Sequence, residues 1–238
     1  MKPTTTINYK TSWLVAEARG RSHITSVLQD IRERHMIQQC DVVELGSGIG
    51  TNLSIFAANN RVLGVEGMGE AVLESKARGV TAIQANLEES LALPSDSADW
   101  ILCMDVLEHL MNPVACLDSA YRLLRNDGHL IVNVPNHFDW RGRMRLLRGS
   151  GIDSQGYFPE SRIWAYPHVR FFQRATIEEL LLSVGFTVEE DFSYRFNTFP
   201  KATLFSRIGA QNLLQALQIR WPDLFSAGYF LVCRKMNG

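Results

Sequence analysis

The sequence predicts an α/β domain in which short apolar strands alternate with amphipathic helices. Its 238 residues and 46% hydrophobic composition suit one domain of this class. The apolar run at residues 41–45 leads into three glycines at alternate positions, Gly46, Gly48 and Gly50, and a helix is expected to begin at Thr51. Such a loop accommodates a nucleotide-like cofactor, because glycine allows sharp turns and the helix start offers free N–H groups.

The remaining elements follow from hydrophobic periodicity and from glycine, proline and capping residues. The expected strands are residues 41–45, 61–66, 80–85, 99–104, one within 124–136, one beginning at 185–188, and 228–234. The expected helices are residues 22–38, one beginning within 51–58, 68–78, 113–125 and 176–183, with a lid or interface helix within 204–220. We expect one domain over residues 1–238, with an N-terminal helical cap at 1–38 and an insert at 137–172.

Composition excludes several classes of protein. A net charge of −1 gives no indication of nucleic-acid binding. The N-terminus lacks the apolar core of a signal peptide, and no apolar run is long enough to cross a bilayer, so we predict a cytoplasmic protein without a transmembrane segment. The cysteines are far apart and lack C-x-x-C spacing, which predicts buried thiols and neither a disulfide framework nor a metal site. These are Cys40, Cys103, Cys116 and Cys233.

The glycine loop distinguishes between cofactor classes. The dinucleotide pattern G-x-G-x-x-G fails because Thr51 occupies the third glycine position, and no Gly-Lys-Ser/Thr follows as in a P-loop. The pattern present is E-x-G-x-G-x-G, from Glu44 to Gly50. It resembles motif I of the class I S-adenosylmethionine (SAM)-dependent methyltransferases. A tight turn that binds no ligand is the alternative.

The second strand ends in an acid, Glu66, twenty positions after Gly46, and Gly67 leaves room beside it. A nucleotide-binding βαβ unit places a ribose-binding acid at about this distance. A carboxylate can accept two hydrogen bonds from a vicinal diol, which explains the need for an acid. A solvated strand end is the alternative interpretation.

Three further stretches carry the family resemblance. Residues 93–110 resemble the family's LP…D-x-S-F-D-x-V…L-E-H block, and residues 124–136 resemble its strand-five signature. Residues 168–172 resemble the H-x-R-F-F segment of the methyltransferase type 11 group, and the spacing around the insert resembles its MetW-like branch. The resemblance covers residues 41–136 well and 165–190 in part.

This resemblance implies a seven-stranded, doubly wound, mostly parallel sheet whose seventh strand is antiparallel, with SAM as cofactor and S-adenosylhomocysteine as product. Glu44 would contact the ammonium group of SAM directly or through water, and the glycine loop would contact the rest of the methionine moiety. An acid would bind the ribose, and an amide would bind the adenine. The implied cofactor contacts are Glu44, Gly46, Ser47, Gly48 and Gly50, Met104 beneath the methionine part, Glu66 and Gly67, and Asn86 and Leu87.

Methyl transfer needs a base only if the acceptor must lose a proton. His109 and His168 are the candidates because imidazole titrates near neutrality, and a packing role for His109 is an equal alternative. No amide-methylating N-P-P-Tyr motif follows the fourth strand, which favours O- or C-methylation.

The acceptor is expected at the insert, which is rich in arginine and aromatic residues. Residues 136–174 hold seven arginines against Asp139, Asp153 and Glu160. These arginines would suit an anionic small-molecule or lipid-linked acceptor, a solvated face or an interfacial helix. A non-catalytic SAM-binding partner of another enzyme, the role attributed to MetW-like proteins, is the alternative function. A homodimer or a protein partner also stays open, whereas an NAD-dependent oxidoreductase is disfavoured.

Overall fold

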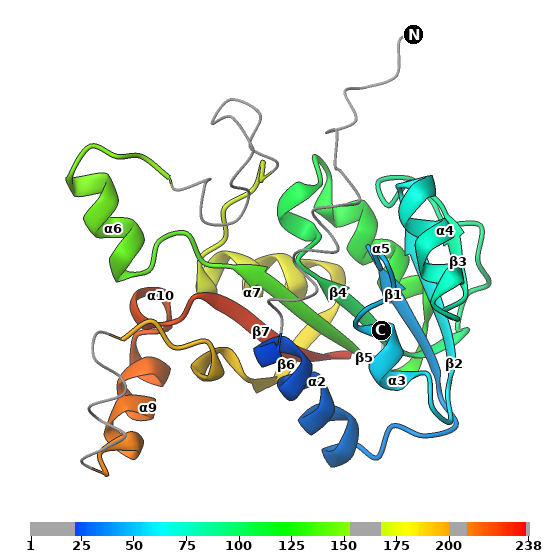
Figure 1. The fold of residues 1–238 in the computed structure, drawn as a ribbon, viewed down its shortest axis with the longest axis horizontal. Coiled ribbons are helices and arrows are strands. Elements are labelled where there is room, and N and C mark those ends of the chain that lie inside the picture. Colours follow the sequence, from blue (N-terminus) through cyan, green and yellow to red (C-terminus); the bar gives the residue numbers. More distant parts are fainter. Residues whose placement is uncertain (1–21, 153–167, 200–208, 237–238) are drawn as a thin grey trace, which may run out of the picture.

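The chain folds around a seven-stranded sheet with the strand order β3-β2-β1-β4-β5-β7-β6 (Figure 1). The computed structural model describes residues 22–152, 168–199 and 209–236. The strands are β1 Asp41–Leu45, β2 Arg61–Glu66, β3 Ala82–Gln84, β4 Ala98–Met104, β5 Leu124–Pro135, β6 Phe186–Asp191 and β7 Gly228–Lys235. Only β7 runs against its neighbours β5 and β6. The predicted doubly wound sheet with an antiparallel seventh strand is confirmed.

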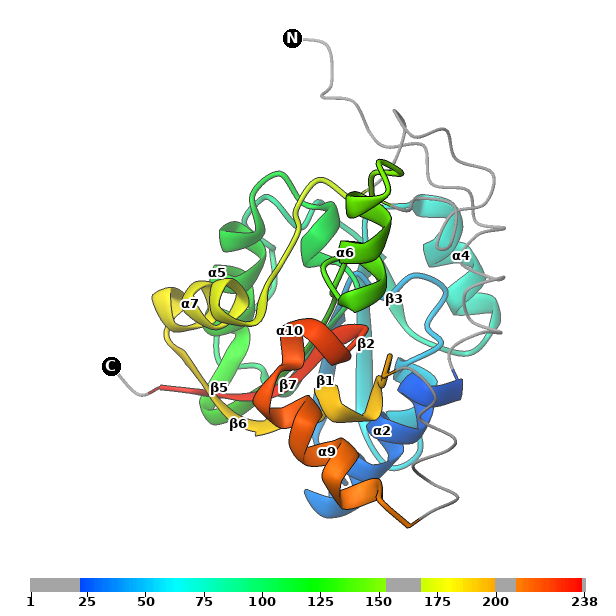
Figure 2. The ribbon, with the colours of Figure 1, turned by 90° about the vertical axis from the view of Figure 1, so that its left-hand side faces the viewer.

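Helices cover both faces of the sheet, with α5 and α7 on one side and α2 on the other (Figure 2). The helices are α2 Ser22–Arg34, α3 Leu53–Phe56, α4 Gly69–Ala77, α5 Pro113–Leu123, α6 Trp140–Leu147, α7 Arg174–Val184, α9 Gln211–Arg220 and α10 Pro222–Phe225. Two single turns of 3-10 helix are η1 Leu107–His109 and η3 Ser193–Arg195.

The central strands are buried on both faces, which explains their nearly continuous apolar sequences. Successive side chains alternate between two hydrophobic clusters because a strand has a period of two residues. Val43 and Ile101 join the cluster with α5 and α7, whereas Val42 and Leu102 join the cluster with α2 and α3. Both helical layers are therefore fixed to the same central strands.

Several elements are shorter than their sequence patterns predict. Helix α2 ends at Arg34 and not near residue 38, because Met36 adopts a left-handed φ of 47°. The helix after the glycine loop spans only Leu53–Phe56, so its N-terminus contributes little dipole to a cofactor. Strand β3 starts at Ala82, because the Val80 N–H donates to the Ser75 carbonyl in the turn that follows α4.

Helix α6 is the described helical part of the insert, and it projects from the end of β5 (Figure 1). Asp139 caps it by accepting a hydrogen bond of 2.8 Å from the Gly142 N–H. Any side chain at Gly142 would clash with the His137 carbonyl. Of the insert, residues 137–152 and 168–172 are described, whereas Tyr157, Arg162, Trp164 and Tyr166 lie outside the described residues.

The N-terminal helix covers a face of the sheet. Helix α2 buries Ile24, Val27, Leu28 and Ile31 against the cluster that it shares with α3. The rest of the expected N-terminal cap, including Tyr9 and Trp13, falls outside the described residues.

All four cysteines are free thiols, and three of them are buried in the core as expected. Cys103 and Cys116 lie with their sulfur atoms 4.0 Å apart, and burial raises the pKa of Cys233 to about 12. Within the described ranges, no helix has both the length and the apolar composition that crossing a membrane would require.

His129 gives the fold a testable pH dependence. Its ring stacks on Trp100 with the ring centres 4.5 Å apart, and burial lowers its pKa against the opposing effect of Glu189, while His35 and Arg234 also lower it. A histidine with a lowered folded pKa is protonated preferentially in the unfolded chain, so its stabilising contribution is lost as the pH falls below about 6.5.

We therefore expect the free energy of unfolding to fall more steeply on acidification from about pH 7 to about pH 5 in the wild type than in His129→Gln. Urea unfolding at several pH values measures both slopes. Equal slopes in the two proteins would contradict the prediction.

Candidate active site

The glycine loop adopts the backbone that its sequence predicts. Gly46, Gly48 and Gly50 have φ angles of 79°, 52° and 78°, in the left-handed region that disfavours other residues. The N–H groups of Gly46 and Ser47 donate to the Val65 carbonyl at 2.8 and 3.2 Å. The loop is thus held against the end of β2.

Two of these glycines are required by packing within the protein. A Cβ at Gly46 would lie 2.6 Å from a methyl carbon of Val106, and one at Gly50 would lie 2.6 Å from the Ser75 hydroxyl. The sequence interpretation attributed the glycines to a sharp turn beside a ligand, and these contacts show that packing against the protein itself also requires two of them. Gly46 therefore brings the loop into direct contact with the segment that follows β4.

Two candidate cofactor residues beside the loop point toward the protein. Glu44 is fully buried and accepts a hydrogen bond of 2.7 Å from the Asn52 side-chain amide, just before α3. Ser47 is buried, and its side chain occupies the space left by the missing Cβ of Gly64. Both residues shape the loop, and their contact with a cofactor stays a prediction.

Glu66 connects the loop to the end of β2. Its carboxylate accepts hydrogen bonds from the Gly48 N–H at 2.8 Å and the Met68 N–H at 2.9 Å. Each carboxylate oxygen retains a second acceptor position, and the side chain is half-buried. Gly67 is exposed, and a Cβ there would meet no atom closer than 3.9 Å. The predicted ribose site therefore has both an acceptor and room.

The other predicted cofactor residues differ in accessibility. Asn86 is exposed, and its side chain closes a local turn by accepting from the Glu88 N–H and donating to Glu89. Leu87 and Met104 are 6% and 2% exposed and belong to the two core clusters. A contact between these three residues and adenine or methionine stays a prediction.

The segment after β4 leads into η1, a single turn of 3-10 helix that contains two polar residues. Asp105 adopts a left-handed φ of 53°, and η1 follows with Glu108 and His109. The Glu108 carbonyl accepts hydrogen bonds from the N–H groups of Val169 and Arg170, at 2.8 and 3.0 Å. These bonds fix the segment before α7 beside η1.

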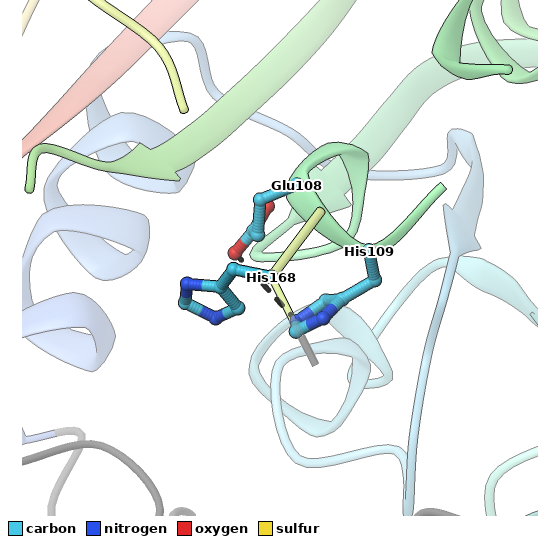
Figure 3. Close-up of side chains that lie close together, drawn as sticks. All are labelled: Glu108, His109 and His168. Atoms are coloured by element: carbon cyan, nitrogen blue, oxygen red, sulfur yellow. Dashed lines mark ion pairs between the residues drawn. The ribbon is translucent and has the colours of Figure 1, made fainter. Parts of the chain in front are cut away.

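The two candidate bases are brought together by this arrangement, as Figure 3 shows. The ring centres of His109 and His168 are 4.6 Å apart, and the Nε2 atom of His109 lies 3.8 Å from a Glu108 carboxylate oxygen. The His109 side chain is 16% exposed, whereas His168 is 7% exposed. His109 is therefore the more accessible of the two.

His137, which the sequence interpretation missed, completes the cluster. Its Nε2 atom lies 2.9 Å from Nδ1 of His168. Burial lowers the pKa of His168 to about 2 and that of His137 to about 4, so both rings are neutral near pH 7 and His168 is a weak base. Its position just beyond the carboxyl end of β5 was the available signal, because ligands bind at that edge of a parallel sheet.

Several arginines of the insert are engaged within the protein. Arg141 pairs with Asp139 at 2.7 Å, Arg143 donates to the Phe138 carbonyl at 2.7 Å, and Arg170 donates to the Met111 carbonyl. Arg174 pairs with Glu178 and Asp191. The row of positive charge predicted from the sequence thus also stabilises the insert and its surroundings.

The sheet order, the glycine loop after β1, the acid at the end of β2 and the polar turn after β4 define the class I SAM-dependent methyltransferase fold. The sequence model of a methyltransferase domain family matches residues 18–191, and the chain belongs to this family. SAM is the cofactor that this family and fold imply.

Known proteins agree with this assignment. A Mycolicibacterium smegmatis protein named "Probable S-adenosylmethionine-dependent methyltransferase" is 30% identical over 67% of this chain and 56% of its own length. A ubiquinone biosynthesis O-methyltransferase of Psychrobacter arcticus is 24% identical over 73% of this chain and 70% of its own length. The alignment thus spans little more than half of the mycobacterial relative. Neither relative bears on the MetW-like branch, which stays a prediction.

Among solved structures, a Haloferax volcanii methyltransferase in complex with the Trm112 methyltransferase activator shares the fold. Its TM-score is 0.60 at 17% sequence identity, and the match covers 98% of this chain and 99% of that one. At this identity the likeness shows the fold alone.

Proposed function

We propose that this protein transfers a methyl group from SAM to a small-molecule or lipid-linked acceptor, by O- or C-methylation. The observation that carries the proposal is the contact between the glycine loop and the turn after β4. Gly46 packs directly on Val106, three residues before His109. A methyl donor held by the loop and an acceptor held at η1 would therefore be neighbours.

The loop and the end of β2 offer the groups that SAM requires. The backbone around Gly46 and Gly48 would approach the methionine part, and Glu66 and Gly67 would receive the ribose hydroxyls. Glu66 already holds two backbone N–H groups, so it is positioned for this role before the cofactor binds. The methionine site would be shaped by Glu44, Ser47, Gly50 and Met104. The adenine site would be formed by Asn86 and Leu87.

SAM would supply an electrophilic methyl carbon for an in-line displacement. A lone pair of the acceptor would bond to that carbon as the carbon–sulfur bond breaks, and S-adenosylhomocysteine would be the leaving product. The sulfonium is already electrophilic, so the protein mainly positions the acceptor and excludes water. For a hydroxyl acceptor the proton would pass to His109, since the low pKa of His168 makes that residue a weak base.

The acceptor site is proposed at the insert. Helix α6 and the segment around Phe171 both lie next to the histidine cluster, where the His137 and Phe171 rings are 5.1 Å apart. The similarity to a ubiquinone biosynthesis O-methyltransferase supports an oxygen acceptor. The exposed apolar residues of α6, Met144, Leu146 and Leu147, support a lipid-linked one.

Methyl transfer from isotopically labelled SAM to a cell extract tests the proposal. Extraction into organic and aqueous phases would separate lipid-linked acceptors from water-soluble ones. Labelled product in either phase supports the proposal. SAM binding without transfer to any extract fraction would instead favour the alternative, a SAM-binding partner of another enzyme. Absence of SAM binding would sink both.

A protein partner for this chain has one supporting observation, since a structural neighbour from Haloferax volcanii, itself named a putative methyltransferase, is found with an activator protein. Co-purification of a stoichiometric partner would support a protein partner, and a dimer in light scattering would support a homodimer. A cytoplasmic location also stays a proposal, consistent with four free thiols. Fractionation of cells would test it.

The α6 arginines provide a separate prediction. Replacing Arg141, Arg143 and Arg145 by Ala is expected to raise the KM for the acceptor and to leave SAM affinity within about threefold, because α6 lies outside the glycine loop. Arg61→Ala, on an exposed side chain at the start of β2, is the matched control. Loss of SAM binding by the folded triple variant, or normal turnover of the acceptor, would contradict the prediction.

A further inference from the structure

Three side chains with metal-binding chemistry converge beyond the carboxyl ends of β4 and β5. Glu108 and His109 come from η1, and His168 comes from the segment before α7 (Figure 3). One ligand atom of each lies within 4.8 Å of the others. Ligand atoms around a tetrahedral zinc ion stand about 3.4 Å apart, given bonds of about 2.1 Å. Small side-chain rotations would therefore bring all three to coordinating distance.

The backbone holds these ligands together although they are far apart in the sequence. The Glu108 carbonyl binds the N–H groups of both Val169 and Arg170, so His168 is anchored directly beside η1. The Arg170 side chain adds a further bond to the Met111 carbonyl. A binding site held by main-chain contacts is preorganised, because little order must be gained when the ion arrives.

A hydrogen bond with His137 orients His168, because Nδ1 of His168 lies 2.9 Å from Nε2 of His137. With the proton of the neutral His168 ring on Nδ1, this bond runs from Nδ1–H of His168 to Nε2 of His137. This tautomer leaves a lone pair on Nε2 of His168. Histidine ligands commonly donate their other N–H in this way, which fixes the tautomer and the ring orientation.

The donor set selects a class of ion. Two imidazole nitrogens and one carboxylate suit zinc and other first-row transition dications, whereas magnesium and calcium prefer oxygen ligands. With neutral imidazoles the three side chains carry one negative charge, which complements a dication. Glu108 and His168 are buried, and His109 is partly exposed.

We propose that Glu108, His109 and His168 bind one first-row transition dication of the zinc type, with His137 positioning His168. The absence of C-x-x-C spacing led to the expectation of no metal, but that pattern does not detect ligands from η1 and a distant segment. Three protein ligands leave at least one coordination position for water or for an oxygen of the acceptor. The acceptor contact rests on the proposed methyl transfer, whereas ion binding does not.

Cobalt(II) titration of the metal-free full-length protein tests the proposal. We expect one ion per chain by calorimetry, with the visible absorption bands of a low-symmetry site. A thiolate-to-metal charge-transfer band would indicate cysteine ligands, and we expect none. Zinc at equal concentration should displace cobalt, and magnesium should not. The titration contains neither SAM nor an acceptor, so its result is independent of the proposed function.

Single-residue variants assign the ligands. Glu108→Gln and His109→Gln are each expected to weaken cobalt binding at least tenfold, and His137→Gln by about 10- to 100-fold through misorientation of His168. His129→Gln, which removes a histidine within β5 that contacts Trp100 and Glu189 and not the cluster, should bind as the wild type does. Circular dichroism confirms that each variant is folded. No binding of cobalt or zinc by the wild type, or unchanged binding by both Glu108→Gln and His109→Gln, would overturn the proposal.

Discussion

Glu66→Ala is expected to weaken SAM binding by about 10- to 150-fold while the protein stays folded. This range corresponds to roughly 1.5–3 kcal/mol for hydrogen bonds that involve a charged group. The variant loses the acceptor for the ribose and also releases the Gly48 and Met68 N–H groups that the carboxylate holds. Calorimetric titration with SAM measures the effect.

Two further variants separate the causes. Glu66→Gln keeps the shape but places an N–H donor against one of the two backbone donors, so it should also bind SAM weakly. Glu70→Ala removes an exposed acid from the first turn of α4 and should leave the affinity unchanged. A loss of less than threefold in Glu66→Ala would place Glu66 outside the cofactor site.

The glycine loop and Glu66 could be predicted because their signals are local. Two local patterns are each visible within about ten residues: a buried strand followed by glycine at β1, and a strand that ends in an acid at β2. The doubly wound arrangement and the direction of β7 came from the family resemblance, because pairing between distant strands leaves no local signal. The structure confirms both.

The length of the helix after the loop could not be predicted. Residues 51–58 have helical composition, but the Asn52 amide is committed to the buried Glu44 rather than to a helix cap. This contact depends on the position of β1 relative to α3, which the sequence does not state. A tertiary interaction therefore overrides local propensity here.

The histidine cluster shows the same limit more strongly. His109 was a candidate because it lies in a family motif, and His168 because it lies in another. Their convergence depends on the Glu108 carbonyl binding Val169 and Arg170, a main-chain contact that no side-chain pattern reveals. His137 was missed because no motif contained it. The arginines of the insert were assigned to an anionic acceptor, a solvated face or an interfacial helix, whereas several of them form contacts within the protein.

His109→Gln is expected to lower methyl transfer by about 10²-fold or more while SAM affinity stays within about threefold of the wild type. Loss of a general base would have an effect of this size, and so would loss of a ligand to an ion that activates the acceptor. His109 is partly exposed and lies in the turn that follows Val106. The glycine loop packs against Val106. The substitution should therefore affect the transfer step and spare the cofactor.

The two possible roles of His109 give different results with the same assay. If His109 is the base, dialysis against a chelator leaves wild-type turnover intact, and Glu108→Gln retains most of it. If His109 holds an ion, chelation and Glu108→Gln both lower turnover, and added zinc restores the wild type but not the variant. His23→Gln, on the exposed side of α2, is the control and should turn over normally. Wild-type turnover in His109→Gln would exclude both roles, because neither a base nor a metal ligand can be removed without loss of rate.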